Sequence, residues 1–234
     1  MNKIEMMPVG MNLREVWDTL REVGGQQTVD HSLRVGKLMY DFAETIGEDK
    51  YTWRDCGFLH DIGKIGVPAD IIASKTSLTR VQFSKIKHHV VAGAGYLWNL
   101  KMWKTNSANA KAHQALAIAC SDFHHAWVDG THDSDDHKGG YYRGMKDREE
   151  YSFKGEAIPF IARCCALCDV FEAITANRSY DPARTPQEAL HIMARGFGRQ
   201  FDKNLFFVFF VSVLKKEGCN FTKEEVAEAI KASL

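Results

Sequence analysis

The sequence predicts an all-α fold, and three observations carry that prediction. Apolar residues recur at helical spacing along most of the 234 residues, and no alternating segments joined by a tight turn indicate a β-hairpin. Three segments show the pattern of a helix capping box, in which Thr is followed three residues later by Gln or Glu: Thr79–Gln82, Thr185–Glu188 and Thr222–Glu225. Neither an internal repeat nor a linker is visible, so we expect one domain over residues 1–234.

Helical spacing and start signals mark the helices of the first half of the chain. We expect them over residues 12–23, 28–46, 52–59, 79–87 and 108–123. The glycine pair Gly24–Gly25 is expected to end the first of them. Three of the others lead directly to a pair of side chains that can bind metals: His60–Asp61, His88–His89 and His124–His125.

The second half of the chain combines a polar stretch with a buried helix. Residues 127–151 are polar and hold four of the glycines, which predicts a long loop, and loops of this length are often functional. Residues 158–176 are apolar on almost every face, which predicts a central helix. That helix carries Arg163 and Asp169, and buried charges of this kind need a partner. The run Phe206–Phe210 is expected to be core or a homodimer face.

Composition limits the partners and the compartment. Lys plus Arg equals Asp plus Glu, so the formal net charge is zero, which argues against a long nucleic acid or an anionic membrane as partner. No signal peptide is visible, and the longest apolar run, residues 205–214, is too short to span a bilayer. The cysteines form no disulfide framework, and Cys164, Cys165 and Cys168 fit small core residues best. We therefore expect a cytoplasmic protein.

His and Asp residues at helix ends and on the buried helix could together form a metal site. The candidates are His31, His60, Asp61, one of His88 and His89, His124, His125 and Asp169. This mixture of nitrogen and oxygen donors suits iron, manganese, zinc or nickel, and suits magnesium or calcium poorly. Two ions bridged by Asp61 and a hydroxide could lower the pKa of the bridging water and stabilise an in-line displacement at phosphorus. No serine-hydrolase elbow, Walker loop or dinucleotide-binding motif is visible.

These motifs resemble those of the HD-GYP branch of the HD-domain metal phosphohydrolases, in the order of that family. The matching stretches are 31–35, 59–68, 86–89 with Gly93, 124–125 with 129–130, 158–163, 168–173 and 177–180. The resemblance implies an HD-domain helical bundle with its core motifs over residues 27–202, followed by C-terminal helices over 203–234. It also implies a centre of two or three metal ions and hydrolysis of cyclic di-GMP or a related cyclic dinucleotide.

The resemblance also assigns roles to individual residues. It implies these metal ligands, with Asp61 as the bridge: His31, His60, Asp61, His89, His124, His125 and Asp169. Lys64 would act with Asp61 in catalysis by contacting a substrate phosphate and offsetting its charge. Arg163 and Arg178 are expected to contact phosphate or guanine, although Arg163 would equally suit a structural ion pair. Tyr141 could stack on a purine or anchor its loop.

Three departures from the family pattern refine the prediction. Gln27 stands where members with three metals have Glu, so we expect two ions and a linear dinucleotide as product. Ala126 replaces a Glu that would help to orient a ligand. The Gly-Tyr-Pro signature is degenerate, because an insertion over residues 131–138 precedes it and Tyr142 stands in place of Pro.

The sequence therefore predicts a metal-dependent phosphodiesterase with a small cyclic nucleotide as its partner. We expect a metal-bridged hydroxide to open cyclic di-GMP to linear pGpG, with iron or manganese expected ahead of zinc or nickel. The first alternative is an HD phosphohydrolase acting on another cyclic dinucleotide or nucleotide. The second is a sensor that binds a cyclic dinucleotide without cleaving it, which would be expected to have lost metal ligands.

Overall fold

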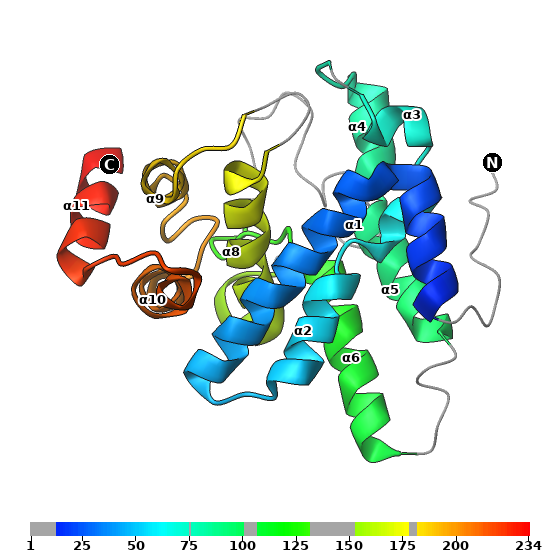
Figure 1. The fold of residues 1–234 in the computed structure, drawn as a ribbon, viewed down its shortest axis with the longest axis horizontal. Coiled ribbons are helices and arrows are strands. Elements are labelled where there is room, and N and C mark those ends of the chain that lie inside the picture. The colour runs from blue at the N-terminus through cyan, green and yellow to red at the C-terminus, as the bar shows by residue number, and fades with distance from the viewer. Residues whose placement is uncertain (1–12, 75, 101–106, 132–152, 178–181) are drawn as a thin grey trace.

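A computed structural model describes residues 13–74, 76–100, 107–131, 153–177 and 182–234. These residues are helices and connecting turns, and their only strand-like pairing is one isolated bridge between Phe197 and Phe201. The all-α prediction is therefore confirmed. In Figure 1 the first helix crosses the middle of the molecule, and the last helices form a group on one side of it.

The first helix, α1 (Leu13–Ile46), spans both of the helices predicted before residue 47. The two parts are joined across a kink at Gly25, whose φ of 71° and ψ of 174° are not helical. Gly25 therefore interrupts the helical backbone where the glycine pair predicts it, and a helical segment lies on either side. The next helix, α2 (Lys50–Leu59), begins earlier than predicted, because Asp49 caps it by accepting a hydrogen bond from the Tyr51 amide.

The middle of the chain folds into short helices that pack beside α1 and α2. Their bounds are η1 (Ile62–Gly66), a 3₁₀ turn, α3 (Ala69–Ile72), α4 (Arg80–Lys87), α5 (His89–Asn99) and α6 (Ala108–Phe123). The capping box at Thr79 opens α4 as predicted, and α6 has the predicted bounds. Each candidate pair of metal ligands lies at one end of these helices.

The last part of the chain surrounds α8 (Phe160–Thr175), which lies between α1 and the C-terminal helices in Figure 1. The other elements are η3 (Gly155–Ala157), α9 (Pro186–Ala194), α10 (Lys203–Val208), the π-helical turn η4 (Phe209–Val213), the 3₁₀ turn η5 (Leu214–Glu217) and α11 (Lys223–Ser233). The capping boxes at Thr185 and Thr222 open α9 and α11, as predicted.

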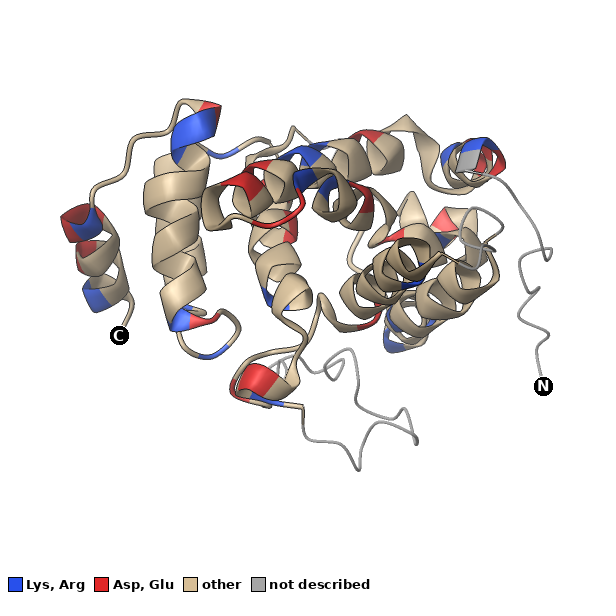
Figure 2. Cartoon of the chain, turned by 90° about the horizontal axis from the view of Figure 1, so that it is seen from below, with Lys and Arg blue, Asp and Glu red and all other residues tan. Residues whose placement is uncertain are grey.

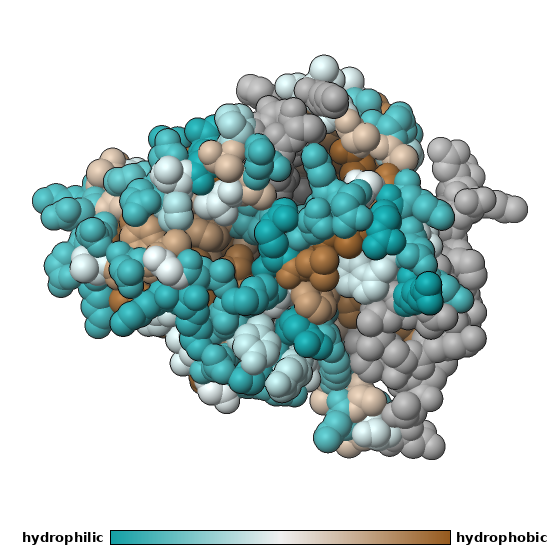
Figure 3. Space-filling model, viewed as in Figure 1, coloured by the Kyte–Doolittle hydropathy of each residue, from teal (hydrophilic) through white to brown (hydrophobic). Residues whose placement is uncertain are grey.

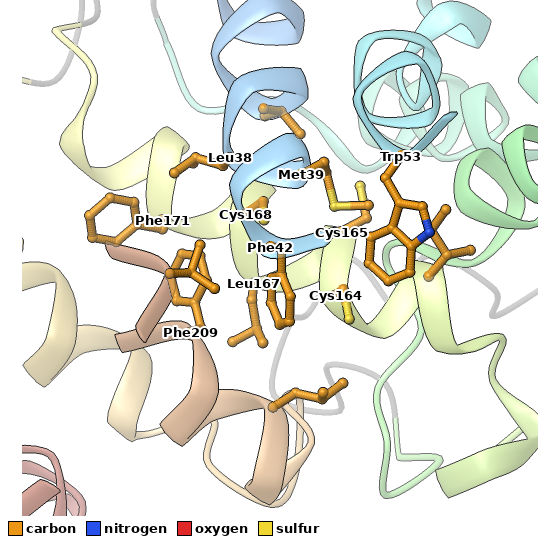
Figure 4. Close-up of a cluster of buried hydrophobic side chains, with 14 of the residues drawn as sticks. Leu38, Met39, Phe42, Trp53, Cys164, Cys165, Leu167, Cys168, Phe171 and Phe209 are labelled. Carbon is orange, nitrogen blue, oxygen red and sulfur yellow. The ribbon is translucent and has the colours of Figure 1, made fainter. Parts of the chain in front are cut away.

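One apolar core joins α1, α2, α8 and the C-terminal helices. Figure 4 shows its centre, where Phe42 from α1 stacks on Phe209 with ring centroids 6.1 Å apart. Cys164, Cys165 and Cys168 point into the same cluster and are fully buried, which confirms that they are core residues. The phenylalanine run likewise belongs to the core, because its members Phe206, Phe209 and Phe210 are completely buried.

Basic and acidic residues alternate along the helices in Figure 2, and the face in Figure 3 is mostly hydrophilic with apolar patches. Among the helices that the structure describes, none is both long enough and apolar enough to cross a bilayer.

Candidate metal centre

The structure brings all seven residues predicted as metal ligands into one buried cluster. They form three overlapping groups whose donor atoms lie within 4.8 Å of one another: His31, His60 and Asp61; His60, His124 and Asp169; and His89, His124 and His125. They come from α1, the turn between α2 and η1, α5, the end of α6, and α8. His88, in contrast, is exposed. Of the two neighbouring histidines, His89 is therefore the one placed to bind a metal.

The carboxylate of Asp61 lies at the centre and faces imidazoles on two sides. Its Oδ2 atom is 3.4 Å from Nε2 of both His31 and His60. Its Oδ1 atom is 3.1 Å from Nε2 of His89 and 3.8 Å from Nε2 of His124. Because each oxygen points to a different pair of histidines, this side chain can contact two ions at once. That is the geometry required of a bridging ligand.

Backbone carbonyls set the tautomers of three of these histidines. Nδ1 of His60 lies 2.8 Å from the Gly57 carbonyl, Nδ1 of His89 lies 2.7 Å from that of Ile86, and Nδ1 of His124 lies 2.9 Å from that of Ser121. A carbonyl oxygen can only accept, so each Nδ1 donates, and the neutral ring then presents its Nε2 lone pair to the cluster. Metal-binding histidines are oriented in this way by a partner on the other ring nitrogen.

Two polar atoms at the centre of the cluster lack the hydrogen bonds that burial normally requires. Among the described residues, His60 Nε2 and Asp61 Oδ1 are buried without a hydrogen bond. His89 Nε2 and His124 Nε2 lie only 3.4 Å apart, although both nitrogens carry lone pairs in the tautomers given above. Buried polar atoms without partners are costly, and divalent cations would satisfy these atoms together. The residues present therefore fit a metal centre.

The electrostatics of the cluster also favour bound cations. Burial would raise the pKa of Asp61, but Lys64 and the imidazoles of His60 and His31 outweigh it and hold that pKa well below its usual range. The pKa of Asp169 is likewise held low, because His31 and His60 outweigh its burial. Burial would lower the pKa of His31, but the surrounding carboxylates raise it to about 9. The cluster thus keeps its carboxylates ionised and stabilises positive charge beside them.

Glu172 is a residue of the site that the sequence analysis did not select. It is almost fully buried on α8, one turn after Asp169, and its Oε2 atom is hydrogen bonded to Nδ1 of His31. A carboxylate on the far ring nitrogen orients a metal-binding histidine and increases its basicity. The signal that could have found it is the spacing Asp169-x-x-Glu172, which places both carboxylates on one face of a helix.

A cavity of about 900 Å³ lies beside this cluster and contains His31 and Lys64 in its lining. Lys64 donates a hydrogen bond to Oδ2 of Asp61, so its ammonium group lies between the candidate metal site and the cavity. One wall is polar and comes from α1, including Gln27, Asp30 and Arg34. Apolar side chains of the lining come from residues 71–86 and include Ile71, Leu78, Phe83 and Ile86. Such a cavity could hold a ligand with phosphates and flat apolar faces.

The remaining sequence predictions meet the structure in different ways. Gln27 lines the cavity with an exposed side chain. Ala126 is buried in a separate small apolar cluster with Val90 and Ile158. Arg178, Tyr141, Tyr142 and the insertion over 131–138, apart from Thr131, lie outside the residues that the structure describes.

Arg163 forms an ion pair, which is one of the two roles that the sequence analysis considered; the other was contact with the substrate. Its Nη1 atom donates to Oδ2 of Asp202 at 2.6 Å, and its Nε atom donates to the Ile158 carbonyl at 3.2 Å. The pair is largely buried, and Asp202 also caps α10. Arg163 is not among the residues that line the cavity. This geometry supports an ion pair that joins α8 to α10.

Replacing Arg163 by Gln should therefore lower stability and leave substrate binding unchanged. We expect the free energy of unfolding in urea to fall by about 2 kcal/mol, because a charge-assisted hydrogen bond is lost and Asp202 loses a partner. Arg195→Gln, at an exposed position, is the matched control. Unchanged stability together with a raised KM would instead identify Arg163 as a substrate contact.

Comparison with known proteins agrees with this site. A family model described as HD domain matches residues 28–174, a segment that contains all seven candidate ligands. A cyclic di-GMP phosphodiesterase of Pseudomonas aeruginosa is 30% identical over 191 residues, which cover 80% of this chain and 40% of that protein. A cyclic di-GMP phosphodiesterase of Thermotoga maritima is 30% identical over 178 residues, which cover 75% of this chain and 42% of that protein.

The same comparison finds a relative that acts on a different cyclic dinucleotide. The 3'3'-cGAMP-specific phosphodiesterase 3 of Vibrio cholerae is 28% identical over 182 residues, which cover 76% of this chain and 34% of that protein. This chain thus spans less than half the length of each of these relatives. Because the family model covers more than half of the chain and the described fold is all-α, the chain belongs to the HD domain family.

Proposed function

We propose that the protein is a metal-dependent phosphodiesterase that opens a cyclic dinucleotide, with cyclic di-GMP as the first candidate. The observation that carries this proposal is the two-sided placement of Asp61 between pairs of histidines, with Lys64 beside it at the wall of the cavity. Relatives named as cyclic di-GMP and 3'3'-cGAMP phosphodiesterases support the substrate class.

Seven residues would hold the metal ions: His31, His60, Asp61, His89, His124, His125 and Asp169. Bound divalent ions would supply a nucleophilic hydroxide and Lewis acids for attack at phosphorus. The protein itself would position the scissile phosphate at the inner end of the cavity. Lys64 would then stabilise negative charge that develops on the phosphate oxygens. The 3′ oxygen would leave, protonated by water or by a neighbouring acid.

We further propose two ions and a linear product. Each oxygen of Asp61 serves one side of the cluster, which suits two ions. Gln27 offers only a neutral amide where a carboxylate would support a third ion, and its side chain is exposed. Nitrogen and carboxylate donors together suit iron or manganese, and zinc or nickel could replace them.

The domain organisation and the compartment of the protein are inferred from its core and its cysteines. Buried side chains from Val16 in α1 to Ile230 in α11 belong to one apolar cluster, which supports a single HD-GYP-type domain. The six cysteines are free, which supports a reducing, cytoplasmic compartment.

Incubation of manganese- or iron-loaded protein with a panel of substrates tests the proposal. The panel should hold cyclic di-GMP, 3'3'-cGAMP, cyclic di-AMP and cyclic mononucleotides, with products separated by chromatography. We expect hydrolysis of a cyclic dinucleotide to its linear form and little further cleavage. Turnover of mononucleotides alone would contradict the substrate class. Tight binding without turnover, in protein shown to contain metal, would identify a sensor instead.

A further inference from the structure

We propose that Arg34 binds the second phosphate of the cyclic dinucleotide, the one that is not cleaved, and that Glu172 holds Arg34 in position for this task. The inference rests on the proposed function, because it concerns the same cavity. It adds a contact that distinguishes a substrate with two phosphates from a simple phosphodiester.

Arg34 projects from α1 one turn after His31 and lines the cavity. Its Nε atom donates to Oε1 of Glu172. Its two terminal amino groups make no hydrogen bond within the described part of the chain, and 51% of the side chain is exposed. The guanidinium group is therefore anchored at one edge and available at the other. A planar guanidinium in this state can bind two oxygens of a phosphate together.

Glu172 links this guanidinium to the candidate metal site. Its Oε2 atom is bonded to His31, and its Oε1 atom is bonded to Arg34. Only 3% of the Glu172 side chain is exposed, so the carboxylate is buried between α8 and α1. One buried group thus fixes the position of a candidate metal ligand and of the guanidinium relative to each other. Such preorganisation reduces the entropy lost when a ligand binds.

The charges of the cavity indicate which phosphate each cation contacts. Besides the candidate metal ligand His31, the basic side chains in the described lining are Lys64 and Arg34. Lys64 is 25% exposed and bonded to Asp61, which places it at the inner end, where the scissile phosphate would lie. Arg34 is twice as exposed and is bonded to Glu172 instead of Asp61. Asp30 is the one acidic side chain in the described lining, and it already accepts a hydrogen bond from Gln26. A cyclic dinucleotide carries two phosphodiesters, so one cation is available for each.

The test compares two substrates in the metal-loaded protein: the cyclic dinucleotide that the wild type hydrolyses, and bis(p-nitrophenyl) phosphate, which has one phosphate. For Arg34→Gln we expect KM for the cyclic dinucleotide to rise roughly 10- to 100-fold, as for loss of a charged hydrogen-bonded pair. The contact to the uncleaved phosphate is the same before and during reaction, so kcat should change little. Both constants for bis(p-nitrophenyl) phosphate should stay unchanged.

Two further variants separate binding from structure. Arg34→Lys keeps a positive charge and should recover part of the affinity. Arg54→Gln is the matched control, because Arg54 pairs with Asp55 on α2 and lies outside the cavity. An unchanged KM for the cyclic dinucleotide in Arg34→Gln would overturn the inference, and so would an equal loss with both substrates. A wild type that hydrolyses bis(p-nitrophenyl) phosphate but no cyclic dinucleotide would instead overturn the proposed function, and the inference with it.

Discussion

Replacing Asp61 by Ala is expected to remove metal and activity together. Its two oxygens face different pairs of histidines, so its removal takes a ligand from both halves of the cluster. Loss of the bridging ligand removes several kcal/mol of charge stabilisation from the reaction, which corresponds to a fall in kcat of roughly 10³-fold or more. The variant also removes the buried carboxylate that accepts from Lys64 and lies beside His31. We therefore expect lower stability even in the absence of metal.

The measurement is metal content per protein by mass spectrometry, in protein purified without added metal, beside the rate of cyclic dinucleotide hydrolysis. Asp61→Asn keeps the volume of the side chain and should lose metal as well, which separates the effect of charge from that of a cavity. Asp70→Asn is the matched control, since Asp70 is exposed and lies outside the cavity lining. Full metal occupancy in Asp61→Ala would rule out the bridging role.

The candidate ligands could be predicted because most of them lie at helix ends that the sequence marks clearly. His60–Asp61 and His124–His125 directly follow helices with plain apolar spacing, and Asp169 stands out as a charge within an apolar helix. When these helices pack around one core, the metal-binding residues at their ends come together, and no additional sequence motif is needed to predict this. The tautomers of His60 and His124 follow from the same helices, because the last carbonyls of each accept from the ring.

The partners of long charged side chains could not be predicted in the same way. Whether Arg163 meets a ligand or Asp202 depends on where α10 packs, and residues 163 and 202 are far apart in the chain. The link from Glu172 to both His31 and Arg34 likewise joins α8 to α1. The backbone at Gly25 could be predicted, because its positive φ interrupts the helix at the glycine pair, but the angle between the two parts of α1 could not.

Replacing Gly63 by Ala should have the second large effect, because η1 lies against α5 with no space for a side chain. A Cβ atom at Gly63 would lie 1.8 Å from the carbonyl oxygen of His89 and 2.6 Å from the amide nitrogen of Gly93. Both obstacles are backbone atoms, so one helix must move away from the other. We expect the free energy of unfolding to fall by about 1–3 kcal/mol or more, as for overpacking of a core.

The same displacement should weaken the metal centre, because η1 follows Asp61 and α5 begins at His89. Oδ1 of Asp61 and Nε2 of His89 lie 3.1 Å apart, and moving η1 away from α5 would separate them. Gly63→Ala is therefore expected to bind fewer metal ions per protein, although every ligand is still present. Gly95→Ala on α5 is the matched control, since a Cβ there meets nothing within 4 Å, and it should raise stability by up to about 1 kcal/mol through helix propensity. Unfolding curves in a chelator, beside metal content, separate the two effects. If Gly63→Ala retained both stability and metal, the close approach of η1 to α5 would not position Asp61 against His89.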